Sequence, residues 1–199
     1  MSVVVISACT SERKDLLVDF QSFESENTFF VDINLENAVR RHLRLPRGNL
    51  DTIQLGNITR LDDSSASIIS LDGVEKMSGL TELYLSDNKL TDLSSLRNLE
   101  QLTILDLSRN KIRDLSPLEK LSNLTHLNID DNEIVNIEPL RSSYSLKVLT
   151  LDHNNVSNVV WLVSLPALES VELSGNPLAG QMISSLRDRG VQVGLVTKN

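Results

Sequence analysis

The chain has 199 residues, of which 40% are hydrophobic and 23% are charged, a composition that describes one folded domain rather than a disordered chain. Its formal net charge of -8 argues against nucleic acids and anionic membrane surfaces as its main partners. The single cysteine excludes an internal disulfide framework and a Cys-rich zinc site, and no apolar run reaches the roughly 18–20 residues of a membrane-spanning helix.

Residues 1–28 form an N-terminal segment that differs from the rest of the chain. Ile6-Ser7-Ala8-Cys9 resembles a bacterial lipobox, in which small residues precede a cysteine that becomes lipidated, and the polar residues 10–28 are typical of a tether. No Lys or Arg precedes Cys9, however, and the apolar stretch is shorter than the roughly 7–15 residues of a secretory signal. Two interpretations stay open, a truncated lipoprotein signal with Cys9 as the lipidation site, or a plain apolar N-terminus that adds a strand.

Residues 29–57 are predicted to form an N-terminal helical cap. Apolar residues and one histidine recur there at helical spacing: Leu35, Ala38, Val39, His42 and Leu43. Asp32 or Asn34 can cap the start of this helix, and Pro46 with Gly48 ends it. Four arginines gather near its end: Arg40, Arg41, Arg44 and Arg47. They suit the helix dipole and solvation, and a docking patch for an acidic group is the alternative.

A 22-residue repeat fills residues 58–178. Asparagines mark it, each 22 residues after the previous one: Asn88, Asn110, Asn132, Asn154 and Asn176. Around them runs the pattern L-x-x-L-x-L-x-x-N-x-[LIV]-x-x-[LIV]-x-x-L, in four full copies and one partial copy, after one degenerate copy that lacks the Asn. One copy is too short to bury its own apolar face, so the copies must stack.

Each copy predicts one short strand and one turn. The L-x-L core alternates inward and outward positions, and the strands of neighbouring copies are expected to form a parallel sheet. The Asn stands where the chain leaves the sheet, and its amide can bond backbone groups of its own and the next coil, which makes the five asparagines a structural ladder. The later apolar residues, spaced by three, predict extended or 3₁₀-like turns on the opposite side.

Residues 179–199 are predicted to form a C-terminal cap. The stretch from Gln181 to Asp188 favours a short helix, and Gly190 follows as its stop. Val191, Val193 and Leu195 then alternate as a last strand. This cap would cover the second open edge of the sheet, which otherwise invites aggregation.

The repeat resembles the leucine-rich repeat family in its 22-residue class, over about residues 58–178. The layout is similar to that of the internalin-type bacterial proteins: residues 30–39 resemble their cap motif, and Leu115-Ser116-Pro117-Leu118 resembles their convex turn. The resemblance implies an α/β solenoid, a right-handed leucine-rich-repeat arc with a parallel β-sheet on its concave face and a cap at each end. It also implies a bacterial, envelope-associated binding protein. The chain departs from that layout in its few repeats, and nothing after them resembles an immunoglobulin-like module or a wall-sorting signal.

The outward positions of the predicted sheet are mostly acidic and have an apolar and aromatic centre. The candidate partner-binding residues are Glu82, Tyr84, Ile104, Asp106, His126, Asn128, Asp130, Val148, Thr150, Asp152 and Glu172. An apolar centre ringed by carboxylates suits a protein partner with a basic surface. Residues of this kind also stand on strands that bind nothing, because Ile and Val favour strands in any case.

Asp130 and Asp152 are expected to come close together across adjacent coils. Two carboxylates about 5 Å apart repel each other unless something compensates their charge. A hard cation such as calcium is one interpretation, and screening by water and salt is the other. No metal ligand is assigned on this basis.

The sequence therefore predicts a non-catalytic, monomeric protein-binding module in the bacterial envelope, without cofactor, metal or nucleic-acid partner, and with membrane contact only through a lipid anchor. It contains no G-x-S-x-G, Walker or Rossmann pattern, which argues against an enzyme. The alternative is a cytoplasmic scaffold or regulatory subunit, similar to proteins that dock on a phosphatase. An enzyme or carbohydrate binder is a third class, and the 4% of aromatic residues argues against a sugar-binding platform.

Overall fold

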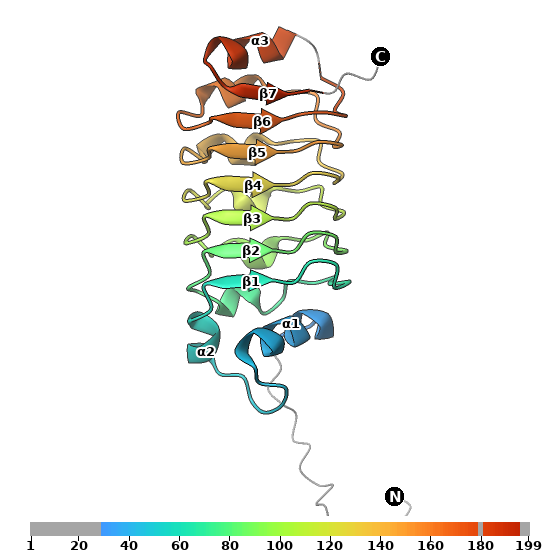
Figure 1. Cartoon of the computed structure of the whole chain (residues 1–199), viewed down its shortest axis with the longest axis vertical. Coiled ribbons are helices and arrows are strands. Elements are labelled where there is room, and N and C mark those ends of the chain that lie inside the picture. Colours follow the sequence, from blue (N-terminus) through green and yellow to red (C-terminus); the bar gives the residue numbers. More distant parts are fainter. Residues whose placement is uncertain (1–28, 179–180, 196–199) are drawn as a thin grey trace, which may run out of the picture.

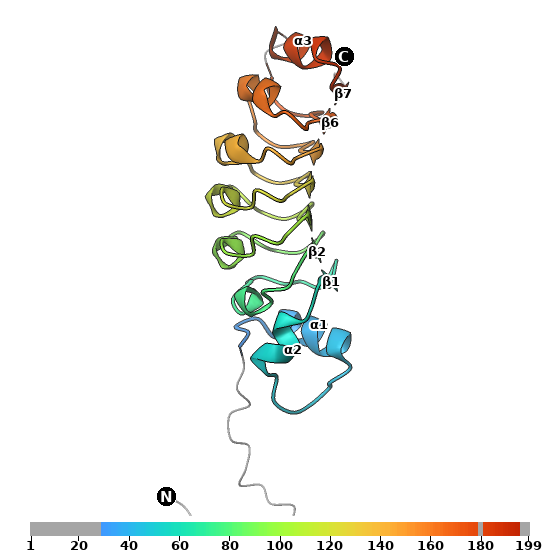
Figure 2. The same ribbon diagram turned by 90° about the vertical axis from the view of Figure 1, so that its left-hand side faces the viewer.

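The computed structural model describes residues 29–178 and 181–195, which form a column of stacked coils (Figure 1). Seven parallel strands lie in chain order in one sheet: β1 Arg60–Asp62, β2 Glu82–Tyr84, β3 Ile104–Asp106, β4 His126–Asn128, β5 Val148–Thr150, β6 Ser170–Glu172 and β7 Gln192–Gly194. The opposite side carries short 3₁₀ helices (Figure 2): η1 Val74–Lys76, η2 Ser94–Leu96, η3 Ser116–Leu118, η4 Glu138–Ser142 and η5 Val160–Ser164. The predicted leucine-rich-repeat solenoid is confirmed.

The L-x-L pattern becomes the core because its leucines point into the column. Leu83, Leu105 and Leu127 are the middle residues of successive strands, pair in register and are buried. The residues on either side of them face outward, as the period of two in a strand requires. Each fully buried Leu contributes about 1.5–3 kcal/mol of hydrophobic stabilisation, and most of its contacts come from the neighbouring coils.

The asparagine ladder joins each coil to the one before it. Asn132 is 7% exposed, and its Nδ2 donates to the carbonyl of Ile129 in its own coil (3.1 Å) and to that of Leu107 in the preceding coil (3.0 Å). Its Oδ1 accepts from the N–H of Ile112, also in the preceding coil (2.9 Å). The sequence led us to expect the next coil instead. The amide points backward along the column, where turn groups of the preceding coil lack backbone partners.

A second column follows the strands and has a left-handed backbone. Its members are spaced by 22 residues and have positive φ between 52° and 73°: Ser65, Asp87, Arg109, Asp131, His153 and Gly175. The sequence analysis did not predict this conformation. Asp87, Asp131 and Gly175 could have indicated this conformation, because Gly and Asp adopt left-handed backbone more readily than other residues.

A third column starts the 3₁₀ helices and was also missed. In each case the side-chain oxygen accepts from the N–H two residues later: Asp92, Asp114, Asn136 and Asn158. This local bond sets the turn that begins each helix. It also lowers the pKa of Asp92 and of Asp114, because the hydroxyl and N–H groups of Ser94 and Ser116 donate to the charged carboxylates.

The caps cover both ends of the column. The expected helix α1 spans Ile33–Leu43 and is capped by Asp32, and the expected C-terminal helix α3 spans Gln181–Asp188 and leads into β7. The short helix α2, Thr52–Gly56, was not predicted, although its capping box of Asp51 and Gln54 is legible in the sequence.

Asp32 also fastens the N-terminal cap to the first coil. Its Oδ1 accepts from the N–H of Asn34 (2.7 Å), and its Oδ2 accepts from the N–H groups of Ile69 (2.5 Å) and Ser70 (3.2 Å). Burial alone would raise the pKa of Asp32, but these backbone hydrogen bonds together hold it below its ordinary value. The charged form of Asp32 is therefore the one that stabilises the cap.

The substitution Asn132→Ala is expected to lower the free energy of unfolding by about 1–3 kcal/mol, because it leaves buried turn groups of two coils unpaired. Chemical denaturation measures this loss. Asn123→Ala is the matched control: Asn123 is exposed and donates to the Glu100 carbonyl at the surface, so its loss should stay within about 0.5 kcal/mol. Equal losses in the two variants would show that the ladder is not what stabilises the turns.

The substitution Asp32→Asn is expected to destabilise the protein at neutral pH by about 1–3 kcal/mol, because an amide has one acceptor oxygen in place of two charged ones. The folded-state pKa of Asp32 is lowered, so its contribution is present above about pH 4 and is lost as the pH falls through that lower value. Denaturation curves of both proteins should therefore converge in acid. A difference that persists unchanged below pH 3 would contradict this assignment.

Candidate functional site

The sheet face consists of the outward residues of β1–β6 and the residues that follow each strand. Two outward columns run along it in register, because the parallel strands pair at intervals of 22 residues. The first column is Arg60, Glu82, Ile104, His126, Val148 and Ser170. The second column is Asp62, Tyr84, Asp106, Asn128, Thr150 and Glu172. The structure thus places the predicted partner-binding residues on a single surface.

The centre of the sheet face is a short apolar stripe. Ile104, His126 and Val148 are direct neighbours on β3, β4 and β5, with Ile104 and Val148 half-buried and His126 exposed. Parallel strands lie about 4.8 Å apart, so these three side chains are immediate neighbours along the column. His126 Nδ1 lies 2.9 Å from the Thr125 hydroxyl, an interaction that orients the imidazole ring.

The N-terminal end of the sheet face holds a neutralised cluster that the sequence analysis missed. Arg60 forms an ion pair with Glu82, and its guanidinium lies 4.2 Å from the centre of the Tyr84 ring. The Tyr84 hydroxyl donates to the same Glu82 carboxylate (3.1 Å). The hydrogen bond that Arg60 donates to the Glu82 carboxylate raises the pKa of the guanidinium. Glu82 already faces a cation, so less of its charge is available to a basic partner.

Asp106, Asn128 and Thr150 are occupied by bonds within the sheet face. One Asp106 oxygen accepts from both the N–H and the hydroxyl of Ser108 (2.9 and 2.8 Å). The Thr150 hydroxyl donates to the side-chain Oδ1 of Asn128 (2.8 Å), which also accepts from the N–H of Asp130 (3.1 Å). These bonds fix side-chain orientation before any partner arrives.

Asp130 and Asp152 hold the backbone of the following coil. Asp130 Oδ1 accepts from the N–H of Asp152 (2.7 Å), and Asp152 Oδ1 accepts from the N–H of Ser174 (2.6 Å). Burial raises the pKa of Asp130 and outweighs the opposing hydrogen bonds from Asp152 and Thr150. Backbone N–H groups thus offset the negative charge of these two carboxylates, a role that we had considered for a bound cation. Across the described ranges, no three His, Cys, Asp or Glu side chains are grouped to hold a metal ion.

The rim of the sheet face carries the left-handed column. The Asp87 carboxylate accepts from the Ser65 hydroxyl (2.8 Å), and His153 Nδ1 lies 3.4 Å from Asp131 Oδ1. The side chains of Asp87, Asp131 and His153 are exposed, and so is Arg109, which lies between the two Asp residues in this column. At the far end, the Glu172 carboxylate lies over Gly194, where an added Cβ would collide with its Oε2. Gly194 makes room for Glu172 in the last turn of the column.

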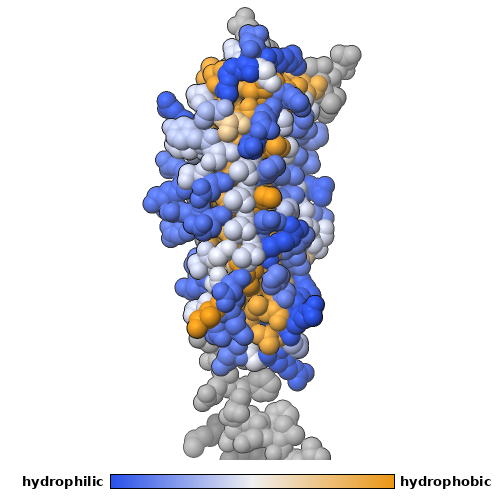
Figure 3. All heavy atoms as spheres, turned by 60° about the vertical axis from the view of Figure 1, so that its left-hand side comes forward, coloured by the Kyte–Doolittle hydropathy of each residue, from blue (hydrophilic) through white to orange (hydrophobic). Residues whose placement is uncertain are grey.

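The face of the column drawn in Figure 3 is largely polar along its length. Figure 3 shows apolar side chains gathered near the two ends, with only small apolar spots between them. In the part of the chain that the structure describes, no helix has the length and apolar character needed to cross a bilayer. Cys9 lies outside the described residues.

Comparison with known proteins places the repeats in a family. Models described as "Leucine Rich repeats (2 copies)" match residues 78–119 and 100–142, and one described as "Leucine rich repeat" matches residues 122–178. A search of the curated proteins finds no match.

Two similar solved structures are internalins from Listeria monocytogenes. The internalin InlF is 26% identical with a TM-score of 0.69, and the match covers 84% of this chain but only 56% of the InlF chain. Internalin C2 is 26% identical over 84% of this chain and 95% of its own, with a TM-score of 0.46. The family matches together span residues 78–178, half of the 199-residue chain, and the chain belongs to the leucine-rich-repeat proteins, with an internalin-like fold.

Proposed function

We propose that this protein is a non-catalytic binding module that recognises a partner protein through its sheet face. The observation that carries the proposal is the stripe of Ile104, His126 and Val148, which lies in register over three strands at the middle of the face. Binding energy in protein interfaces concentrates in such a central apolar patch when a polar rim shields it from water. The rim of exposed Asp87, Asp131 and His153 fits that arrangement.

The charge on the rim favours a partner with a basic surface. Asp87 and Asp131 are exposed on the same edge, on either side of Arg109, whereas Glu82 is paired with Arg60. Carboxylates in solvent steer an oppositely charged partner and set its orientation more than they add affinity. We therefore assign the basic contact to the rim carboxylates and not to Glu82, which the sequence analysis counted among the acidic residues of the face.

The sheet face is also ordered in advance. The Asn ladder, the Asp130 and Asp152 bonds and the Asn128–Thr150 bond hold backbone and side chains in place. Association is costly when side chains must be immobilised at the interface, and a prearranged surface reduces that cost.

A photo-crosslinking amino acid placed at Ile104 or Val148 tests the proposal. We expect the same partner protein to be captured from both positions, because both lie in the stripe. The matched control is position 119, where Glu119 is exposed beside η3 on the opposite side of the column. Mass spectrometry of the crosslinked products identifies the partner, and capture from position 119 but not from the stripe would move the binding site to the other side.

We propose further that the protein is attached to the bacterial envelope through lipid on Cys9. The support is the sequence Ile6-Ser7-Ala8-Cys9, with the only cysteine of the chain in the lipobox position. A polar segment between this residue and the cap would serve as the tether.

The intact mass of the protein, expressed from its native upstream region, tests this attachment. We expect a chain that begins at Cys9 and carries the added mass of two or three acyl groups, recovered in the membrane fraction. The substitution Cys9→Ser should abolish the added mass and move the protein to the fraction without membranes. An unmodified wild-type chain would exclude lipidation and favour the cytoplasmic scaffold.

A further inference from the structure

The carboxylates around the N-terminal cap are engaged inside the fold. Glu36 accepts from Arg40 Nε (2.7 Å) in a buried pair, and Asp63 of the first coil accepts from Arg41 Nη2 (2.6 Å). Asp51 caps α2, and Asp32 holds the backbone of the first coil. Asp32 and Glu36 are buried, whereas Asp51 is exposed. All four carboxylates have partners within the fold, although the chain as a whole carries a charge of -8.

Two arginines at the same end have no such commitment. Arg44 and Arg47 are exposed and pair with no carboxylate among residues 29–178 and 181–195. Arg44 is the C-cap of α1, but Arg47 lies beyond the helix, where the helix dipole has little effect. Internal pairing thus accounts for Arg40 and Arg41 and the helix end for Arg44, whereas none of these contacts accounts for Arg47.

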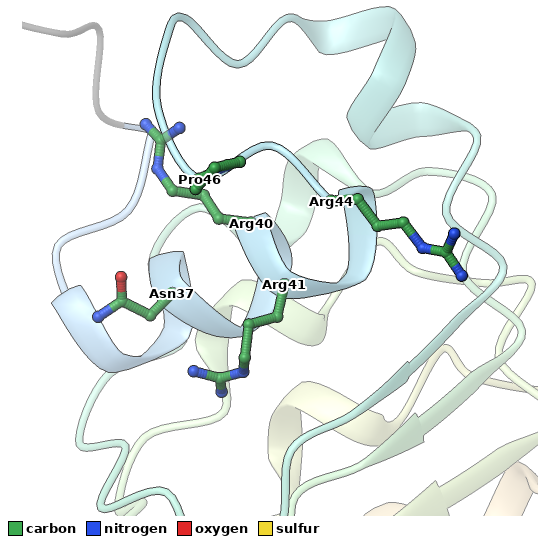
Figure 4. A pocket seen from close by; sticks show the side chains of 5 residues that line it. All are labelled: Asn37, Arg40, Arg41, Arg44 and Pro46. Atoms are coloured by element: carbon green, nitrogen blue, oxygen red, sulfur yellow. The ribbon is translucent and has the colours of Figure 1, made fainter.

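The arginines surround a shallow groove at the end of α1. Asn37, Arg40, Arg41, Arg44 and Pro46 line its volume of about 270 Å³. Figure 4 shows the guanidinium groups of Arg40, Arg41 and Arg44 spreading in different directions from this end of the helix. Of these three, Arg40 is buried against Glu36 and Arg41 is paired with Asp63, so Arg44 is the one whose charge meets no carboxylate in the described ranges.

The same end exposes large apolar side chains. Val31 and Ile53 are each 76% exposed, and Ile33 is 64% exposed. Val31 and Ile33 flank the N-cap of α1, Ile53 belongs to α2, and both helices lie at the end of the column where the described chain begins at Phe29 (Figure 1). Basic groups next to exposed aliphatic groups are the two components that hold a protein at an anionic membrane surface.

We propose that the N-terminal end of the column rests on an anionic lipid surface, with Arg44 and Arg47 facing the headgroups and Val31, Ile33 and Ile53 inserted among them. An acidic protein would use the arginines, but the aliphatic side chains belong to separate elements and form no pocket for it. Residues 1–28, which include Cys9, join the fold at this same end. The column then extends away from the membrane, and the sheet face stays free for a protein partner.

Vesicle sedimentation of the full chain without lipidation tests this contact. We expect binding to vesicles of phosphatidylcholine and phosphatidylglycerol in equal parts, weak binding to phosphatidylcholine alone, and release by high salt. The double substitution Arg44→Glu with Arg47→Glu should weaken binding at least about tenfold, because each basic residue near an anionic surface is worth roughly fivefold.

The matched control is Arg97→Glu with Lys120→Glu, which changes the net charge equally at exposed positions beside η2 and η3. It should leave vesicle binding nearly unchanged. Absence of binding to the mixed vesicles, or equal loss in both double variants, would overturn the proposal and leave the arginines to a protein partner.

If the glutamate variant unfolds, two other variants test the same contact: the double substitution Arg44→Gln with Arg47→Gln, and the single substitution Ile53→Ser. Each should weaken binding to the mixed vesicles. Crosslinking from Ile104 reports on the sheet face independently, so the two proposals can fail separately.

Discussion

Every buried turn in the column must find partners for its backbone N–H and C=O groups, and the rest of the structure depends on how this is done. A 22-residue coil leaves the sheet, crosses to the 3₁₀ side and returns, so part of its backbone lies inside without a strand beside it. The amides of Asn110, Asn132 and Asn154 supply both a donor and acceptor at that point. They also join each coil to its predecessor, so a single side chain fixes both the turn and the stacking distance.

This repeated constraint produces a surface whose properties are set by columns. Once the inward residues are fixed by packing, the outward positions of β1–β6 are free to vary without cost to the core. The structure uses this freedom in two ways. Arg60, Glu82 and Tyr84 satisfy one another, whereas Ile104, His126 and Val148 are left open to solvent. Asp130 has two roles. It is part of the sheet face, and its carboxylate also holds the next coil by accepting from the N–H of Asp152.

The sequence predicted those features that are set by local pattern and by period. The strands, the 3₁₀ turns and the helices α1 and α3 follow from apolar spacing and capping residues, which act within a few positions of the chain. The contacts that it did not predict depend on where a side chain points after the coils have stacked. The pairing of Arg60 with Glu82 joins residues 22 positions apart, and nothing in either residue distinguishes a pair from two free charges. The backward direction of the Asn132 amide and the engagement of Asp152 by Ser174 have the same origin. The helix α2 was missed for another reason, since five residues are too few for a clear period.

The stacking of coils also fixes how far each strand lies from the N-terminal cap. Each coil contacts only its neighbours, and successive strands lie about 4.8 Å apart, so adding or removing one 22-residue unit changes the height of the column by one fixed step. The stripe of Ile104, His126 and Val148 occupies the third, fourth and fifth strands, which gives it a defined height above the N-terminal cap. A change in coil number below the stripe would raise or lower the surface that a partner meets without altering its chemistry. In this architecture, evolution can therefore change the height at which the binding surface lies as well as its affinity for a partner.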